Sequence, residues 1–247
     1  MNDSRKTYLV IGGSSGIGLS IAKRLATNGA RIIIVSQSKS KLEKAASELD
    51  GEHHLTFSYD LSDSNHIEDV FSYIHTNNIL LDGMVYSAGI APLCLLKENT
   101  PMLMEKVFQI NFFSFVESVK YFQMETVSCN NARIVAIASI MARGSGYRQT
   151  LYGAAKAALV SSVKLMAKEL LNRGIHINCI SPGVVESELL DDLRINSAGL
   201  DEKIKNTQLL GIITPESIAD AAHYLLTAGS EFLTGGEFII DGGALLK

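Results

Sequence analysis

Tyr152 and Lys156 lie four positions apart in the segment Tyr152-Gly-Ala-Ala-Lys156, and Ser139 precedes the tyrosine by thirteen residues. On a helix, residues i and i+4 share one face, so the phenol and the ammonium would lie close together. A free phenol titrates at about pH 10, and a nearby ammonium favours the phenolate and lowers that pKa. Such a tyrosine can take a proton from an alcohol or give one to a carbonyl. The alternative is a surface lysine one turn after a half-buried tyrosine.

Two further polar residues accompany this pair. Ser139 ends an apolar, strand-like run, where its hydroxyl would orient a substrate oxygen and stabilise developing charge. Asn111 lies in Ile110-Asn-Phe-Phe, inside a long helical segment. An amide among phenylalanines is destabilising unless it is hydrogen-bonded, which indicates a function. The alternative for Asn111 is a single hydrogen bond to the backbone.

A glycine-rich turn follows the first apolar run and opens the first helix. Gly12 permits a tight turn, Gly16 lets the backbone approach a pyrophosphate, and Gly18 allows close packing of helix and strand. The helix N-terminus offers free N–H groups to the phosphates, and Ser14 and Ser15 add hydroxyl donors. No Gly-Lys-Ser/Thr follows, so the turn predicts a dinucleotide site rather than an ATP-type loop.

The elements that would position these residues alternate between short, β-branched apolar runs and helix-length segments. This alternation is typical of a parallel sheet covered on both faces. We therefore expect an α/β fold, a single Rossmann-type doubly wound sheet of about seven strands, as one domain over residues 1–247. The expected strands are Tyr8–Ile11, Arg31–Val35, His54–Tyr59, Gly83–Tyr86, Arg133–Ala138, His176–Ile180 and Glu237–Ile240, and the expected helices are Gly16–Asn28, Lys39–Leu49, Ser64–Thr76, Met102–Val127, Leu151–Asn172 and Pro215–Thr227.

Composition excludes several classes of function. The net charge of −4 disfavours nucleic-acid binding, and the six histidines form no ligand cluster with any cysteine, so no metal site is expected. Three dispersed cysteines suit reduced thiols better than a disulfide framework. No apolar run approaches the ~20 residues that cross a bilayer, and no signal peptide is evident. These features predict a soluble cytoplasmic protein without membrane partners.

Two of the expected helices are apolar on more than one face. Met102–Val127 carries five closely spaced aromatic or aliphatic positions around Phe112, and Leu151–Asn172 combines alanines with larger apolar residues. Such helices must be buried by more than their own sheet. We expect them to pack against another subunit in a homo-oligomer, a tetramer. Deep burial within one monomer is the alternative.

The motifs together, over essentially the whole chain, resemble those of the short-chain dehydrogenase/reductase family. The glycine turn, Asp60-Leu61, Ala88-Gly89 and Pro182-Gly183 with Ser187 match the family's cofactor-binding segments. The resemblance implies hydride transfer between a nicotinamide and a carbonyl or alcohol. It implies catalytic roles for Asn111, Ser139, Tyr152 and Lys156, with Asn111 holding a water near the lysine. It implies cofactor contacts from Gly12, Ser14, Ser15, Gly16, Ile17, Gly18, Ser36, Gln37, Ser38, Lys39, Asp60, Leu61, Ala88, Gly89, Tyr152, Lys156, Pro182, Gly183, Val185 and Ser187.

The chain departs from the family pattern at several places near the cofactor. Ile11 stands where the family usually has threonine before the turn, and Ser187 replaces a threonine but keeps the hydroxyl. Tyr86-Ser87 replaces the family's Asn-Asn, which we interpret as a change in the hydrogen bonds that support the strand backbone. The segment after the second strand, Val35-Ser-Gln-Ser-Lys39, lacks the acid that NAD enzymes place there for the ribose hydroxyls. It also lacks the arginine of many NADP members, but Ser36, Ser38 and Lys39 could hold a 2′-phosphate. We favour NADP(H) over NAD(H); a solvated loop is the alternative interpretation of that segment.

The sequence motifs constrain the identity of the substrate less than that of the cofactor. Residues 188–213 form the expected lid, and Met141, Tyr147 and the segment 91–96 are expected to line the opposite side. The nearest subgroup resembles 3-oxoacyl-[acyl-carrier-protein] reductases, in which basic residues dock the acidic carrier; Arg173 fits that role. A secondary-metabolite or sugar ketoreductase fits equally well. A non-catalytic dinucleotide sensor is an alternative function, although such proteins tend to lose the tyrosine or the lysine. Sugar epimerases and dehydratases are a third alternative, but they generally have a longer C-terminal substrate region than this chain.

Overall fold

A seven-stranded parallel sheet runs through the molecule in the order β3-β2-β1-β4-β5-β6-β7. The computed structural model describes residues 5–63, 67–144, 146–188, 190–191, 194, 199–227 and 230–246, with residue 203 described for its backbone only. The strands are β1 (Thr7–Ile11), β2 (Arg31–Ser36), β3 (Leu55–Ser58), β4 (Leu81–Tyr86), β5 (Ser128–Ile137), β6 (His176–Pro182) and β7 (Glu237–Ile240). All seven predicted strands are present, and the expected Rossmann-type doubly wound fold is confirmed.

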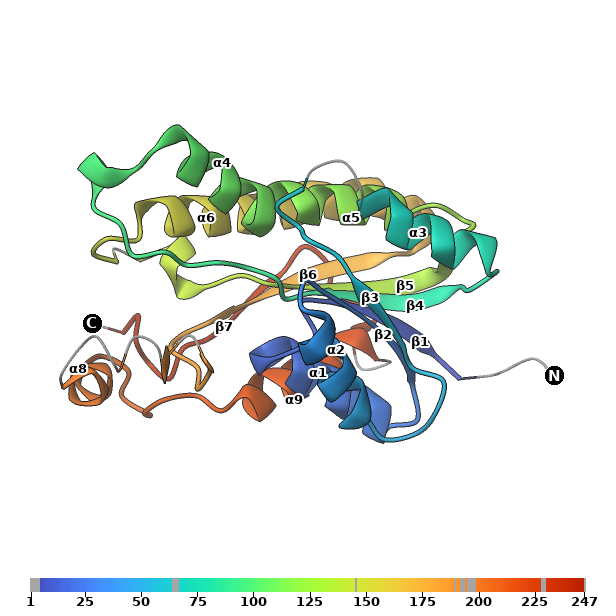
Figure 1. The fold of residues 1–247 in the computed structure, drawn as a ribbon, viewed down its shortest axis with the longest axis horizontal. Helices are drawn as coiled ribbons and strands as arrows, with labels where there is room; N and C mark the ends of the chain where they lie inside the picture. Colours follow the sequence, from blue (N-terminus) through green and yellow to red (C-terminus); the bar gives the residue numbers. More distant parts are fainter. Residues whose placement is uncertain are drawn as a thin grey trace.

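Helices cover both faces of the sheet (Figure 1). One layer holds α1 (Gly16–Thr27), α2 (Lys39–Ser47) and α9 (Pro215–Leu226), and the other holds α3 (Ile67–Thr76), α4 (Pro101–Phe108), α5 (Ser114–Phe122) and α6 (Thr150–Leu170). Successive residues of β1 point to opposite faces, since Leu9 and Ile11 pack under the α6 layer while Tyr8 and Val10 pack under the α1 layer. Burial on both faces explains why the strands are apolar throughout.

The strand order reverses at β1, which pairs with β2 on one side and β4 on the other. In register, Ile11 lies between Val35 and Tyr86, so the carboxyl ends of the three strands meet at one edge of the sheet. A crevice forms at such a switch point in doubly wound folds. The loops after β1, β2, β4, β5 and β6 all emerge at this edge.

The prediction of one continuous helix over Met102–Val127 is wrong in two respects. It consists of α4, a π-helical segment at Gln109–Phe113 and α5, and it ends at Phe122, after which a turn leads into β5. Within the π-helical segment, Nδ2 of Asn111 donates to the carbonyl of Val107, 2.9 Å away and four residues back. The side chain thus competes for an acceptor that an α-helix gives to the backbone. π-Helical segments occur frequently at functional sites.

Among its described residues, the region predicted as a lid contains helix α8 (Leu200–Thr207), which the sequence did not predict. It lies within the connection between β6 and α9, at one end of the molecule (Figure 1). Leu189 and Leu193, which we expected in the lid, lie outside the described residues, as does the start of the third predicted helix at Ser64. In the described part of the chain, no helix is both long and apolar enough to span a membrane.

Candidate active site

A cavity of about 510 Å³ opens at the carboxyl edge of the sheet. Seventeen of the predicted site residues line it: Gly12, Ser14, Ser15, Ile17, Ser36, Gln37, Asp60, Leu61, Ala88, Gly89, Ser139, Tyr152, Lys156, Pro182, Gly183, Val185 and Ser187. Five others do not line it, namely Gly16, Gly18, Ser38, Lys39 and Asn111. Residues that are far apart in the sequence therefore meet around one site, because β1 to β6 all end there.

The glycine turn shapes the floor of this cavity. Gly12 has a φ of +82°, and a Cβ there would lie 2.5 Å from the backbone N of Ala88, so no side chain fits. A Cβ on Gly18 would lie 2.1 Å from the carbonyl O of Gly12, which explains the close contact of helix and turn. A Cβ on Gly16 would meet only Ser187, at 4.0 Å, so the N-terminus of α1 faces open space. This geometry fits a pyrophosphate against the helix N-terminus.

Hydroxyl and amide groups line the cavity where β2 ends. Ser14 Oγ donates to Ser36 Oγ at 2.6 Å, and Gln37 Nε2 donates to a carboxylate oxygen of Asp60 at 2.7 Å. Hydrogen bonds from the backbone N–H and hydroxyl of Ser62 hold the pKa of Asp60 below its usual value. No acidic residue follows β2 directly, as the sequence indicated.

The two other residues predicted for this end of the cofactor lie on the start of α2. Ser38 caps the helix, with its Oγ accepting from the backbone N of Lys41, and Lys39 is exposed. Lys41 itself forms an ion pair with Glu188, 2.6 Å away, which joins α2 to the segment after β6. Lys41, rather than Lys39, therefore links α2 to the segment after β6.

The segment after β6 forms the opposite wall of the cavity and is held by a residue that the sequence did not identify. The buried amide of Gln208 accepts from the backbone N of Val184 at 2.7 Å and donates to the carbonyls of Val184 and Gly211 at 2.9 and 2.5 Å. Gln208 follows α8 directly and lies 24 residues from Val184 in sequence. Only the three-dimensional structure brings the two together.

Ser139, Tyr152 and Lys156 lie together on the adjoining wall. Ser139 follows β5 and starts a 3₁₀ turn at Ile140–Ala142, where its Oγ accepts from the backbone N of Met141 at 3.2 Å. Tyr152 and Lys156 lie one turn apart near the start of α6, and Nζ of Lys156 is 5.8 Å from the centroid of the tyrosine ring. The spacing of four residues thus places both groups on one helix face, as expected.

Lys156 is 3% exposed, and its Nζ donates to the carbonyl of Ile137 at 2.8 Å. Asn111 is fully buried, with Nδ2 donating to the carbonyls of Ile90 and Val107, both at 2.9 Å. Its Oδ1 makes no hydrogen bond within the described residues. A Cβ on Gly89 would lie 2.7 Å from this Oδ1 and 3.4 Å from Nζ of Lys156. The two polar atoms therefore flank the same glycine backbone.

The electrostatics differ from the sequence-based expectation that the lysine lowers the pKa of Tyr152. Burial raises the pKa of Tyr152 above 10.0, and a hydrogen bond with the Ser139 hydroxyl opposes that rise. Burial lowers the pKa of Lys156 from 10.5 to about 8. Both shifts disfavour the charged form, because the cavity wall removes water from both groups. The prediction of a phenol made acidic by the neighbouring ammonium is therefore wrong for this structure.

The wall next to Tyr152 is mostly apolar and includes Met141 and Ala91, which were predicted there, together with Leu190 of the expected lid. Tyr147, also predicted to line the cavity, is 82% exposed and lies outside it. Gln149 lines the cavity and was missed, although its position three residues before Tyr152 was a signal that could have identified it.

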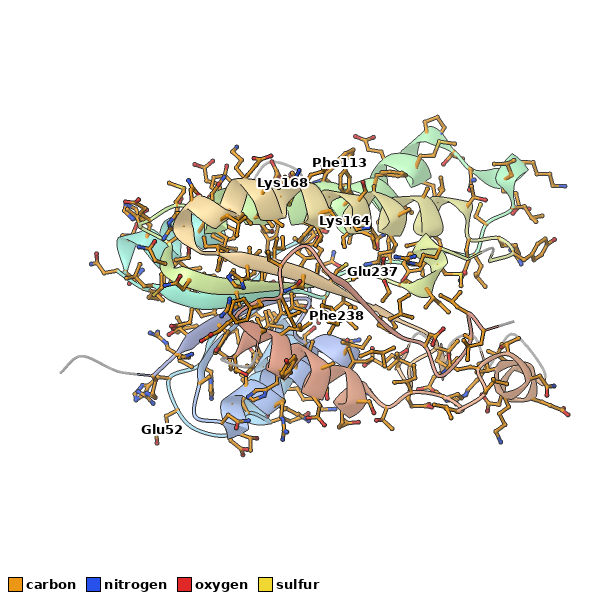
Figure 2. The ribbon with its side chains drawn as sticks, turned by 180° about the vertical axis from the view of Figure 1, so that it is seen from behind. Glu52, Phe113, Lys164, Lys168, Glu237 and Phe238 are labelled. Atoms are coloured by element: carbon orange, nitrogen blue, oxygen red, sulfur yellow. The ribbon has the colours of Figure 1, made fainter. Side chains whose placement is uncertain are left out.

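Arg173, expected to dock a carrier protein, and two loop arginines, Arg143 and Arg148, form hydrogen bonds within the protein. Arg143 forms an ion pair with Glu237 of β7, with Nε 2.9 Å from the carboxylate, and Arg148 donates to the carbonyl of Leu93. Glu237 lies on the α6 side of β7, whereas Phe238 packs on the other side (Figure 2). Arg173 donates to the carbonyls of Gln123 and Ser128 at 2.6 and 2.7 Å. The interpretation of Arg173 as a docking residue for a carrier protein therefore loses its support.

Tyr86 also differs from expectation. Its buried hydroxyl donates to the carbonyl of Ile110 at 2.6 Å, and burial raises its pKa. Tyr86 thus has a structural role, as we interpreted from the sequence. Its hydrogen bond, however, supports the π-helical segment that carries Asn111 and not a strand.

Comparisons with known proteins agree with this geometry. A family model described as enoyl-(acyl carrier protein) reductase matches residues 12–244. Carbonyl reductase family member 4 of Xenopus laevis is 30% identical over 241 residues, 98% of each chain. The 3-oxoacyl-[acyl-carrier-protein] reductase of Chlamydia trachomatis is 31% identical over 243 residues, 96% of each chain. The solved structure of a short-chain dehydrogenase/reductase from Serratia marcescens superposes with a TM-score of 0.89 at 27% identity, covering 97% of each chain.

Proposed function

The chain belongs to the short-chain dehydrogenase/reductase family, oxidoreductases that act on carbonyl and alcohol groups with a nicotinamide cofactor, and we propose that it is a ketoreductase. The observation that carries this proposal is the meeting of Ser139, Tyr152 and Lys156 on one wall of the cavity that the glycine turn opens. Its substrate class is a ketone of the 3-oxoacyl type or one from a secondary-metabolite or sugar pathway.

In the proposed reaction the glycine turn and the segment after β6 would hold a nicotinamide cofactor, which would supply a hydride for the carbonyl carbon of the substrate. Tyr152 donates its phenolic proton to the carbonyl oxygen, and the Ser139 hydroxyl orients that oxygen and stabilises the charge that develops on it. The products are a secondary alcohol and a tyrosinate, which regains a proton from solvent. Lys156 would hold the nicotinamide ribose, and Asn111 Oδ1, which has no partner among the described residues, would hold a water near Lys156.

Burial keeps Tyr152 in the protonation state from which reduction starts. A raised pKa keeps Tyr152 protonated at neutral pH, which is the form that a proton donor to a carbonyl requires. Oxidation of an alcohol instead requires the phenolate, which burial disfavours.

NADP(H) is the cofactor that we propose. The residues at the end of β2 that line the cavity, Ser36 and Gln37, are neutral and themselves carry no charge that would repel a 2′-phosphate. Ser36 and Ser38 offer hydroxyls, and Lys39 and Lys41 lie on the first turn of α2. Comparison of KM for NADPH and NADH tests this choice, and a strong preference for NADH contradicts it.

A homotetramer in the cytoplasm completes the proposal. Large apolar side chains on the α4 to α6 layer are exposed, notably Phe113 at 46% and Leu165 at 65%, which supports burial against another subunit. The three cysteines form no disulfide, which suits a reducing compartment.

A screen of cofactor oxidation tests the proposed function. Purified protein with NADPH is offered β-ketoacyl thioesters, steroid ketones and keto-sugars, and consumption of NADPH is expected with at least one class. Binding of NADPH, measured by quenching of its fluorescence, without turnover on any class would favour a dinucleotide sensor instead.

A further inference from the structure

Gln149 lies directly before α6, three residues ahead of Tyr152, and its half-buried side chain lines the cavity. Residues at i and i+3 lie on the same side of a helix, so its amide borders the part of the cavity next to the reacting phenol. Apolar residues, including Ile140, Met141 and Leu190, line the same cavity.

The side chain of Gln149 does not form the hydrogen bonds that its position would allow. As the residue that caps the N-terminus of α6 it could accept from the helix backbone, yet it makes no side-chain capping bond. Nor does its amide form a hydrogen bond with any other described residue, whereas the buried amide of Gln208 is fully used. A primary amide that lines the cavity therefore keeps its donor and acceptor groups unpaired among the described residues.

Gly146 provides the space for this arrangement. A Cβ at that position would lie 2.2 Å from Oε1 of Gln149 and 2.6 Å from Sδ of Met141. Both side chains thus pack over a bare glycine backbone. Any larger residue at position 146 must displace them, and since both contacts are with the ends of flexible side chains, displacement rather than unfolding is the consequence.

We propose that Gln149 determines specificity by hydrogen-bonding a second oxygen of the substrate, near the carbonyl that is reduced. The inference rests on the proposed function. It explains how the enzyme would discriminate between ketones that carry a second oxygen and alkyl ketones that lack one. An amide that pairs with a substrate oxygen is left unpaired by an analogue without it, and this makes hydrogen-bond recognition selective.

Two ketones of matched length provide the test: ethyl 3-oxobutanoate, which carries a second oxygen, and 2-heptanone, which lacks one. In Gln149→Leu, kcat/KM for the oxo ester is expected to fall by about 10- to 100-fold, the range for one lost hydrogen bond in a site. For 2-heptanone it is expected to stay within about threefold. An equal fall on both ketones, or no fall on the oxo ester, overturns the proposal.

A second variant moves the amide without removing it. Gly146→Ala is expected to lower kcat/KM for the oxo ester selectively, as Gln149→Leu does. Gly144→Ala serves as the matched control, because a Cβ there would meet its nearest atom at 3.4 Å, an ordinary contact. A Gly146→Ala enzyme with the same ratio of kcat/KM for the oxo ester to that for 2-heptanone as the wild type contradicts the proposal. A wild-type enzyme that reduces neither ketone nor any member of the screen refutes the proposed function itself.

Discussion

At the scale of single residues, burial governs the charge of the two central groups. The folded pKa of Lys156, about 8, lies below its ordinary value of 10.5, so between these values the unfolded chain binds more protons than the folded one. Stability must therefore rise with pH across this window. The destabilisation that comes from burying the ammonium is fully present below pH 8 and fades above it.

Lys156→Met is thus expected to abolish turnover and yet raise Tm at pH 7. The gain should be about 1–3 kcal/mol, since a shift of one pKa unit corresponds to about 1.4 kcal/mol and the lost bond to Ile137 offsets part of it. In a chain of this length this amounts to a few degrees. Calorimetry across pH 7 to 10 should show the advantage shrinking; Lys164→Met, at an exposed position of α6, should show none. A Lys156→Met protein with lower Tm at pH 7 would refute this account.

Gln37 provides a residue-scale test of cofactor choice. Gln37→Asp places a carboxylate where β2 ends, and its charge should repel a 2′-phosphate and accept from ribose hydroxyls. The ratio of kcat/KM for NADPH to that for NADH is expected to fall by about 10-fold or more. Gln37→Asn shortens the side chain without adding charge and should leave the ratio nearly unchanged. Equal ratios in both variants would show that the 2′-phosphate lies elsewhere.

At the scale of elements, the strands could be predicted and the irregular segments could not. All seven strands follow from apolar, β-branched runs, because burial on both faces leaves a continuous pattern. The π-helical segment at Gln109–Phe113 could not be predicted in this way, since it depends on the hydrogen bonds of Asn111 and Tyr86 with groups elsewhere in the fold. Helix α8 was missed because it is short and largely polar.

Gln208 shows how one buried side chain can position a loop. Gln208→Ala removes three hydrogen bonds that fasten Val184 and Gly211, and the wall that carries Pro182 to Ser187 should loosen. We expect KM for the cofactor to rise by about 10-fold while kcat at saturation falls less, because the catalytic wall on α6 is untouched. Gln123→Ala, on the exposed turn after α5, is the control. Unchanged cofactor KM in Gln208→Ala would contradict this positioning role.

At the scale of the whole molecule, the proposed subunit interface covers the α4 to α6 layer (Figure 2). Leu165→Glu places a charge at its exposed apolar surface and is expected to dissociate the oligomer, as measured by light scattering coupled to size-exclusion chromatography. Leu80→Glu makes the same change at a similarly exposed leucine before β4 and should not alter the mass. An oligomer that survives Leu165→Glu would place the interface on another surface.

The sequence predicted the composition of the site better than its chemistry. Most of the predicted residues line one cavity, because their motifs follow strands that end at the same edge of the sheet. The direction of the Tyr152 pKa shift was wrong, since spacing along a helix says nothing of the water that burial removes. Gln149 and Gln208 were missed because amide side chains are common in loops, and their role depends on the groups that the fold places beside them.

Turnover by Tyr152→Phe tests most directly whether Tyr152 supplies the proton. We predict that kcat for reduction with NADPH falls by about 10²- to 10⁴-fold, the contribution of a positioned acid, while the Kd for NADPH stays within about threefold. A variant that binds cofactor normally but reduces the ketone at the wild-type rate would contradict the account.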